Sequence, residues 1–264
     1  VESLSHTSMC WRSFTHWIGG MGVLVFLLAV VPLSGGSNVN LMRAESPGPS
    51  FGKLVPKLKT TARLLYLIYF GLTIIQIILL ICGRMPVFDA ITTSFGTAGT
   101  GGFGIKNDSI AGYSLYIKWV VTIFMILFGV NFNAYYLILY KKFKSAFAME
   151  EVKAYLIIII VSVVCIFFNI LKMSTSAVNA ITDSAFQVAS IITTTGFFTT
   201  DFNLWPEASK TILVILMFIG ACAGSTGGGI KVSRLVILIK SLGKDTESYF
   251  HTKIIKKINM DGKH

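Results

Sequence analysis

Two stretches rich in threonine and glycine are the parts of this chain best suited to bind an ion. Asp89–Phe103 aligns without a gap with Asp183–Phe197, and each stretch ends in Gly-Phe. Small residues let backbone carbonyl oxygens face a narrow pathway, and glycine permits the positive φ angles that turn successive carbonyls the same way. Such oxygens can replace the hydration shell of a monovalent cation. The pattern therefore predicts a cation filter; the alternative interpretation is a pair of tight surface turns.

A third glycine-rich segment interrupts an apolar run near the end of the chain. Residues 220–229 contain five glycines directly after Leu213–Ile219, and each glycine costs a helix about 1 kcal/mol relative to alanine. We therefore expect an intramembrane loop that acts as a gate below the filter. Its residues are Gly220, Gly224, Ser225, Thr226, Gly227, Gly228, Gly229 and Lys231. The GxxxG spacing within this segment also fits close helix packing, which is the alternative.

The composition indicates that these segments belong to a membrane protein. Hydrophobic residues make up 53% of the 264 residues and charged residues only 13%, against about 25% charged residues in an average soluble chain. This balance argues against a soluble enzyme, a secreted disulfide scaffold and a disordered chain. The four cysteines lack metal-ligand spacing, and no nucleophile–base pair stands out. We therefore expect neither an enzyme nor a covalently bound cofactor.

Five uncharged apolar runs are each long enough to cross a bilayer, which takes about 20 residues of helix. The runs are Trp17–Leu33, Leu64–Gly83, Trp119–Tyr140, Ala154–Leu171 and Thr211–Ile230. Two shorter apolar segments, Val87–Phe95 and Ala185–Ile192, predict re-entrant helices, and we expect Asp89 and Asp183 at the N-termini of these helices. The fold class expected is an all-α polytopic membrane protein with five spans, two re-entrant pore helices and a broken last span.

Lys and Arg residues are distributed unevenly between the two sides of the membrane that these runs imply. Seventeen of the 23 fall on one side, which the positive-inside rule places in the cytoplasm. We therefore expect the N-terminus outside and the C-terminus in the cytoplasm. The net charge of +11 is explained by these cytoplasmic loops, and no nucleic acid is expected as a partner.

Four polar residues stand within or just before the third and fourth runs. Asn131 and Asn133 lie among apolar residues, where interhelical hydrogen bonds are expected and pore lining is the alternative. Glu150 and Glu151 stand just before the fourth run, and we expect them to be solvated loop charges.

Taken together, three motifs resemble those of one transport family. They are Gly99-Thr-Gly-Gly-Phe103, Thr193-Thr-Thr-Gly-Phe197 and Ala223-Gly-Ser-Thr-Gly-Gly-Gly-Ile-Lys231. In this combination the chain resembles the membrane subunit of the Trk/Ktr potassium uptake systems, and it is more similar to the TrkH type than to the KtrB type. Residues 11–22 also resemble the start of the first pore-lining M2 helix of that family.

The resemblance implies four M1–pore-loop–M2 units in one chain, as in potassium channels. This chain then lacks the first M1 helix and filter and the whole fourth unit, which is expected of a fragment. The implied parts are residues 1–33 as the M2 end of the first unit, 34–61 as a cytoplasmic loop, 62–152 as the second unit, 153–240 as the third unit with its gate loop at 220–230, and 241–264 as a cytoplasmic segment.

The resemblance also implies roles for residues and partners. Potassium, the transported ion, would bind the carbonyl oxygens of Thr100, Gly101, Thr194 and Thr195. Gly99, Gly102, Thr193 and Gly196 would support them. The protein would be a homodimer in the plasma (inner) membrane, in contact with the lipid bilayer. A cytosolic nucleotide-binding RCK-type subunit, TrkA-like, would dock on its inner face.

A secondary transporter is the alternative function. Discontinuous helices that bind a small solute coupled to Na⁺ or H⁺ would account for the broken fifth run. They would leave the two equivalent Thr/Gly stretches on the outer side unexplained.

Overall fold

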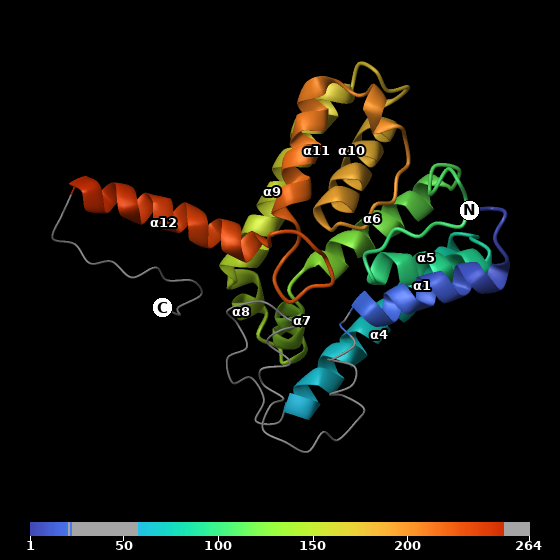
Figure 1. Cartoon of the computed structure of the whole chain (residues 1–264), viewed down its shortest axis with the longest axis horizontal. Coiled ribbons are helices and arrows are strands. Elements are labelled where there is room, and N and C mark those ends of the chain that lie inside the picture. Colours follow the sequence, from blue (N-terminus) through green and yellow to red (C-terminus); the bar gives the residue numbers. More distant parts are fainter. Residues whose placement is uncertain (21, 23–57, 251–264) are drawn as a thin grey trace.

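The computed structural model describes residues 1–20, 22 and 58–250, and within these ranges all regular elements are helical (Figure 1). The elements are α1 (His6–Gly20), α4 (Leu58–Cys82), α5 (Val87–Ala98), α6 (Leu115–Gly129), α7 (Phe132–Leu139), α8 (Phe143–Ala148), α9 (Glu150–Ile170), α10 (Ala177–Ile192), η1 (Phe202–Leu204), α11 (Glu207–Ile219) and α12 (Val232–Phe250). The expected all-α class therefore agrees with the structure. Most of the expected first span and of the 34–61 loop, and residues 251–264, lie outside the described residues.

Two helices in the described part of the chain are long and apolar enough to cross a membrane. They are residues 63–82 of α4 and the whole of α9. The pair α6 and α7 qualifies as a third only if both count as one span, because they are bent by 92° at their junction. Helix α11 has 13 residues, a length of about 20 Å at 1.5 Å per residue. The five-span count remains a prediction.

The bend between α6 and α7 corrects the expectation of one continuous helix over Trp119–Tyr140. Val130 is extended, with φ −76° and ψ 149°, and it ends α6. The Asn131 side chain then accepts a hydrogen bond of 3.0 Å from the backbone N–H of Asn133 and begins α7. Asparagine is a favoured N-cap because its side-chain oxygen satisfies an unpaired N–H of the first turn. The apolar run was visible in the sequence, but the cap inside it was not recognised.

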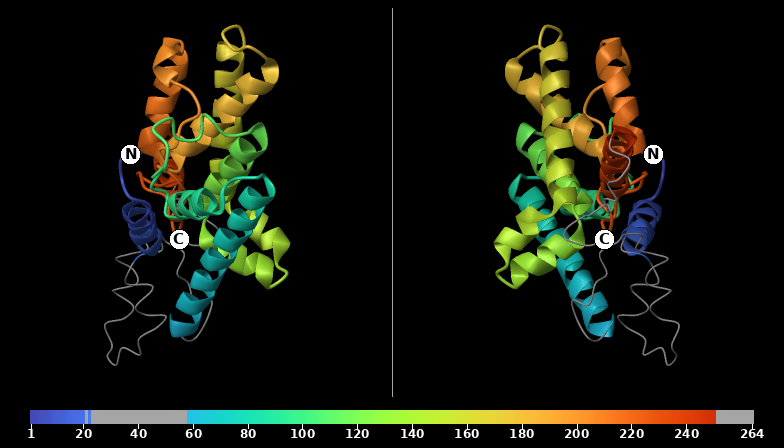
Figure 2. Two further views of the ribbon diagram at one scale, coloured as in Figure 1. Left: turned by 90° about the vertical axis from the view of Figure 1, so that its right-hand side faces the viewer. Right: turned by 90° about the vertical axis from the view of Figure 1, so that its left-hand side faces the viewer.

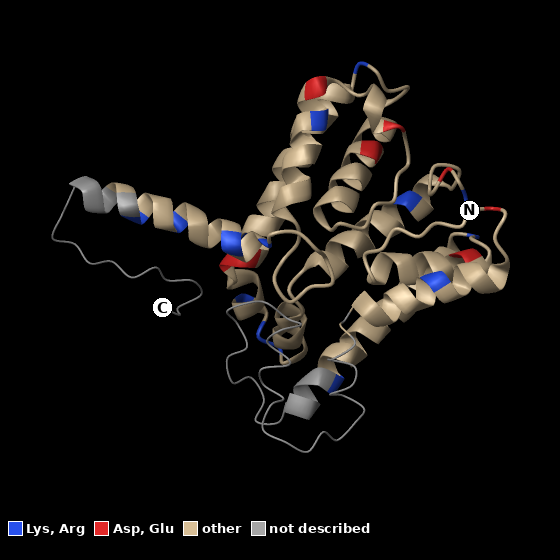
Figure 3. Cartoon of the chain, viewed as in Figure 1, with Lys and Arg blue, Asp and Glu red and all other residues tan. Residues whose placement is uncertain are grey.

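Helices α4 to α7 and helices α9 to α11 form two similarly built groups. The short helix α5 packs against α1, α4 and α6, and α10 packs against α6, α9 and α11. Each of these two helices thus packs against three others, and α9, α10 and α11 lie together in both orientations (Figures 1 and 2). Helix α12 projects away from the other helices, and Lys and Arg residues recur along it (Figure 3).

Aromatic and aliphatic side chains fill the space inside both groups. Tyr69 and Phe128 are buried in one cluster, which Phe186 of α10 also joins. Tyr155 is completely buried in the other cluster. On the outward faces of α4 and α9, apolar side chains such as Leu67 are instead exposed. Extended apolar surface of this kind is typical of a membrane-facing protein.

The two aspartates that were expected to begin the short helices have different positions. Asp89 lies in the first turn of α5, as expected. Asp183 does not begin α10, because that helix starts at Ala177 and is capped by Ser176. Both carboxylates nevertheless accept a hydrogen bond from the segment that follows the Thr/Gly stretch, from Tyr113 Oη at 2.7 Å and from Thr199 Oγ1 at 2.8 Å. Their shared role is to hold the returning chain against the short helix.

The hydrogen bond at Asp89 also affects its partner. Burial, and next the hydrogen bond to the Asp89 carboxylate, raise the pKa of Tyr113 well above its usual value. The phenol therefore stays protonated and continues to donate this hydrogen bond throughout the physiological pH range.

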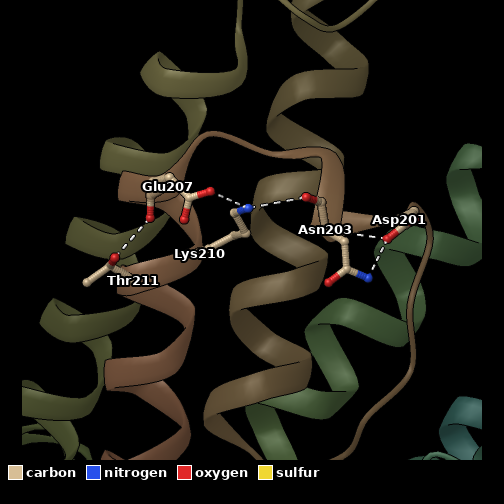
Figure 4. Close-up of polar contacts among 5 residues, drawn as sticks. All are labelled: Asp201, Asn203, Glu207, Lys210 and Thr211. Carbon is tan, nitrogen blue, oxygen red and sulfur yellow. Dashed lines mark hydrogen bonds and ion pairs between the residues drawn. The ribbon is translucent and has the colours of Figure 1, made fainter.

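A polar cluster fixes the connection between η1 and α11 (Figure 4). Asp201 Oδ1 accepts hydrogen bonds from the backbone N–H and the side-chain amide of Asn203, at 3.0 and 2.8 Å. Lys210 pairs with Glu207 at 2.7 Å and donates to the Asn203 carbonyl at 3.4 Å. These contacts set the direction in which α11 leaves the connection.

Candidate functional site

The two Thr/Gly stretches have the same backbone conformation at equivalent positions. Thr100 and Thr194 have φ angles of 55° and 58°, and Gly102 and Gly196 have φ angles of 63° and 88°. Positive φ is uncommon for residues other than glycine. Its occurrence at both threonines indicates that each stretch turns in the same strained manner.

Backbone hydrogen bonds repeat in the same way. Gly96 O accepts from Gly101 N at 2.8 Å and from Gly102 N at 3.3 Å. Ser190 O, the equivalent atom, accepts from Thr195 N at 2.9 Å and from Gly196 N at 3.4 Å. The last carbonyls of α5 and α10 are thus occupied by the N–H groups of the stretch that follows.

Both turns, as far as the described residues show, contain carbonyl groups that remain unpaired. Within the described part of the chain, the carbonyl oxygens of Thr100, Gly101, Thr194 and Thr195 accept no hydrogen bond. The residues themselves are buried or half-buried. Buried carbonyls are nearly always paired with protein or water, so these oxygens are free to coordinate another group.

The two stretches lie against each other. A Cβ atom placed on Gly102 would come within 2.1 Å of the Thr195 carbonyl oxygen. Beyond the stretches, Ile110 N donates to Phe198 O at 3.1 Å, and Phe198 N donates to Ser109 Oγ at 3.3 Å. Segments about 90 residues apart in the sequence therefore lie in contact with each other.

Helix α1 covers the first stretch through two side chains that the sequence did not single out. Arg12 donates to the Gly104 carbonyl at 2.8 Å, and its guanidinium lies 4.8 Å from the centre of the Phe103 ring. The His16 imidazole packs edge-on against the same ring, at 5.1 Å between centroids. It also fills the space beside Gly101, where a Cβ atom would lie 2.3 Å from the imidazole. Both residues belong to the segment 11–22, whose motif was the available signal.

The glycine-rich segment 220–231 is a loop between α11 and α12, as expected. Gly220, Gly224 and Gly229 have φ angles of 73°, 68° and 82°, a region that glycine enters without steric cost. Lys231 also has a positive φ, 81°, and its ammonium group donates to the Gly227 carbonyl. The lysine therefore closes the loop on itself.

This loop contacts both Thr/Gly stretches. Thr100 Oγ1 donates to the Thr226 carbonyl at 3.0 Å, and Gly228 N donates to Thr194 Oγ1 at 2.7 Å. A Cβ atom on Gly227 would lie 3.0 Å from the Thr193 carbonyl oxygen. The structure thus brings together all three segments that the sequence analysis selected.

The loop also pairs with the bend between α6 and α7. Cys222 N donates to Gly129 O at 3.1 Å, and Phe132 N donates to Gly224 O at 3.0 Å. These are the groups that a continuous helix would have satisfied internally. The backbone groups of the bend and of the loop therefore supply each other's hydrogen-bond partners.

Glu151 is buried in this region, which overturns its expected role as a solvated charge. Its side chain is 3% exposed, and it accepts hydrogen bonds from Ala223 N at 2.6 Å, Ser233 N at 3.2 Å and Asn131 Nδ2 at 3.0 Å. The expected polar contact of Asn131 between helices is confirmed by the last of these. A carboxylate directly before an apolar run was the available signal, but its partners are distant in sequence.

A family model described as "TrkH: Cation transport protein" matches residues 1–264. Over 98% of its length the chain is 34% identical to the Trk system potassium uptake protein TrkH of Salmonella typhimurium, and over 100% it is 32% identical to TrkG of Escherichia coli. The crystal structure of the potassium transporter TrkH from Vibrio parahaemolyticus superposes with a TM-score of 0.84 at 30% identity, covering 100% of this chain and 54% of that one. The chain spans about half the length of these curated relatives, 55% of the Salmonella protein and 55% of TrkG.

Proposed function

Because the chain belongs to the TrkH family of cation transport proteins, we propose that it forms part of a potassium pathway through a membrane. The observation that carries this proposal is the paired geometry of the two Thr/Gly stretches, which have unpaired carbonyls, contact each other and contact the same loop. The relatives named above are potassium uptake proteins, which agrees with a pathway for this ion.

The proposed filter consists of backbone oxygens. A K⁺ ion, which is the cargo of the protein, sheds water as it meets the carbonyls of Thr100, Gly101, Thr194 and Thr195. Helices α5 and α10 end at these stretches, so the partial negative charge of each helix C-terminus also favours a cation there. Gly99, Gly102, Thr193 and Gly196 shape the turns that expose the oxygens.

The proposed gate is the loop at residues 220–231. Its hydrogen bonds to Thr100 and Thr194 hold it against the filter. Passage of an ion then requires the loop to move aside. Glycines at positive φ make such a movement feasible, because they impose no side-chain clash on an alternative backbone path.

We further propose the arrangement implied by the family. The protein spans the plasma (inner) membrane several times, with the N-terminus of this chain outside and residues 241–264 in the cytoplasm. It forms a homodimer, and a cytosolic nucleotide-binding RCK-type subunit binds on the cytoplasmic side. The second and third M1–pore-loop–M2 units correspond to residues 62–152 and 153–240, and α12 continues past residue 240.

The test is ion flux through the purified full-length protein in proteoliposomes. We expect rubidium, an analogue of potassium, to enter down its gradient without a requirement for Na⁺ or H⁺, and potassium to compete with it. Uptake that depends strictly on a Na⁺ or H⁺ gradient would instead support the secondary transporter. Absence of any potassium or rubidium flux would contradict the proposal.

A further inference from the structure

We propose that Glu151 is a positioning residue that clasps the glycine-rich loop to the start of α12 and holds the loop against the Thr/Gly stretches. This inference rests on the proposed role of the loop as a gate. The Glu151 carboxylate comes from the first turn of α9, whereas the residues that it holds are Ala223 within the loop and Ser233 just after it.

One carboxylate oxygen contacts both the loop and the helix that follows it. Glu151 Oε1 accepts from Ala223 N at 2.6 Å, inside the loop, and from Ser233 N at 3.2 Å, in the first turn of α12. Since the same atom receives both donors, the loop is fixed relative to the start of α12. The loop cannot leave the filter without breaking at least one of these bonds or shifting α9.

The other oxygen links the loop to the bend between α6 and α7. Glu151 Oε2 accepts from Asn131 Nδ2 at 3.0 Å. The amide orientation is fixed, because Asn131 Oδ1 accepts from Asn133 N at 3.0 Å. Glu151 therefore joins three parts of the chain: the loop, the start of α12 and the bend.

Burial of the Glu151 carboxylate favours the closed position of the loop over other positions. A carboxylate removed from water is tolerated only where donors compensate for the lost hydration, and hydrogen bonds to an ionised acceptor are stronger than neutral ones. Once the loop departs, the Ala223 N–H departs with it, and the carboxylate loses the shortest of its three hydrogen bonds. The closed position of the loop is thus the position in which the Glu151 carboxylate is best satisfied.

The neighbouring Glu150 provides a matched control. It lies in the same first turn of α9 and carries the same charge, so it interacts equally with the helix dipole. Its carboxylate pairs with Lys240 of α12 instead of the loop. Glu150→Gln therefore removes the same charge from the same turn and leaves the clasp intact.

An exchange of side chains separates the clasp from general stability. In Glu151→Gln, a new amide group faces the Asn131 amide, donor against donor. In Asn131→Asp, two carboxylates face each other. The double variant Asn131→Asp/Glu151→Gln restores every pairing. The carboxylate introduced at position 131 accepts a hydrogen bond from the side-chain amide introduced at position 151. The amide oxygen at position 151 still accepts from the backbone N–H groups of Ala223 and Ser233.

The experiment uses Cys222, which is fully buried in the loop, as a reporter of loop position. Full-length protein with all other cysteines replaced by alanine is placed in proteoliposomes and treated with N-ethylmaleimide. We expect each single variant at 131 or 151 to accelerate Cys222 modification about tenfold or more, the scale of one lost charge-assisted hydrogen bond. The double variant and Glu150→Gln should react at the rate of the parent protein. Rubidium influx is measured on the same samples and should follow the same order.

The outcomes separate the clasp from the gate. Parent-like modification rates in both single variants, or failure of the double variant to restore slow modification, would overturn the clasp. If modification follows the expected order while rubidium influx does not change, the clasp stands and the gate role is wrong. Single variants that fail to assemble while the double variant assembles also support the clasp, and a double variant that fails to assemble counts against it.

Discussion

At the scale of single residues, the candidate site depends on positions where only glycine fits without strain or collision. Gly102 faces the Thr195 carbonyl so closely that a Cβ atom would lie 2.1 Å away, and its φ is 63°. Gly196, its equivalent, has a φ of 88° but no atom within 4 Å of a Cβ position. Two equivalent glycines are thus required for different reasons.

The first prediction follows from this difference. Gly196→Ala should incur backbone strain of about 1–2 kcal/mol and reduce potassium uptake, whereas Gly102→Ala adds a steric collision and should abolish it. Growth of a potassium-uptake-deficient bacterium at low potassium measures both. Gly71→Ala in α4, with open space around the position, is the control and should grow normally. Equal growth of the Gly102→Ala and control strains would rule out this account of the filter.

A second prediction concerns the exposed ion pair between Glu207 and Lys210. The Glu207 side chain is 89% exposed, and exposed ion pairs contribute about 0–1 kcal/mol. Glu207→Gln should therefore change the melting temperature of the detergent-solubilised protein by no more than about 2 °C. A larger decrease would mean that the polar cluster at the start of α11 has a structural role beyond setting local geometry.

At the scale of elements, the loop and the short helices act as one assembly. The C-terminal ends of α5 and α10 present the turns, and the loop joins the turns through Thr100 and Thr194. A change in the loop should therefore be transmitted to ion flux.

The third prediction is that deletion of residues 225–228 increases rubidium flux. The deletion removes the Thr226 carbonyl and the Gly228 N–H that meet the filter, and two hydrogen bonds of about 1 kcal/mol each correspond to a shift on the order of tenfold or more. Flux into proteoliposomes is the measurement, and Thr211→Ala near the N-terminal end of α11 is the control. Flux at or below the control level would contradict a gating role.

Much of this assembly could be predicted from the sequence, and the remainder could not for a physical reason. The repeat of Thr100 at Thr194 and the glycine run at 220–229 are local patterns, and they predicted segments that the structure brings into contact. Glu151 was misjudged because its partner Ala223 lies 72 positions away, and no periodicity marks such a pair. The bend at Val130 was not predicted, because an apolar run does not reveal that a loop distant in the sequence will form hydrogen bonds with the backbone groups that the bend leaves unpaired.

At the scale of the whole molecule, the distribution of charge predicts how the protein is oriented in the membrane. Lys and Arg recur on α12, which leaves the bundle (Figure 3), while Glu207 and Lys210 lie at the opposite end of α11 from the loop. The positive-inside rule predicts that α12 lies on the cytoplasmic side of the membrane.

A fourth prediction tests this orientation. In full-length protein without other cysteines, Lys244→Cys should react with a membrane-impermeant maleimide only in inside-out vesicles. Glu207→Cys should react only in right-side-out vesicles or whole cells. Detergent-solubilised samples, in which both must react, are the control. The reverse pattern would invert the proposed topology.

The 92° bend between α6 and α7 has a consequence for how this architecture can vary. The backbone groups that the bend leaves without a partner in the helix form hydrogen bonds with Cys222 and Gly224. An unpaired peptide group inside a bilayer costs several kcal/mol. Shortening the glycine run would therefore favour straightening of the neighbouring helix into an uninterrupted rod. Relatives with a shorter segment at this place should accordingly have lost the kink as well, so that the two features appear and disappear together.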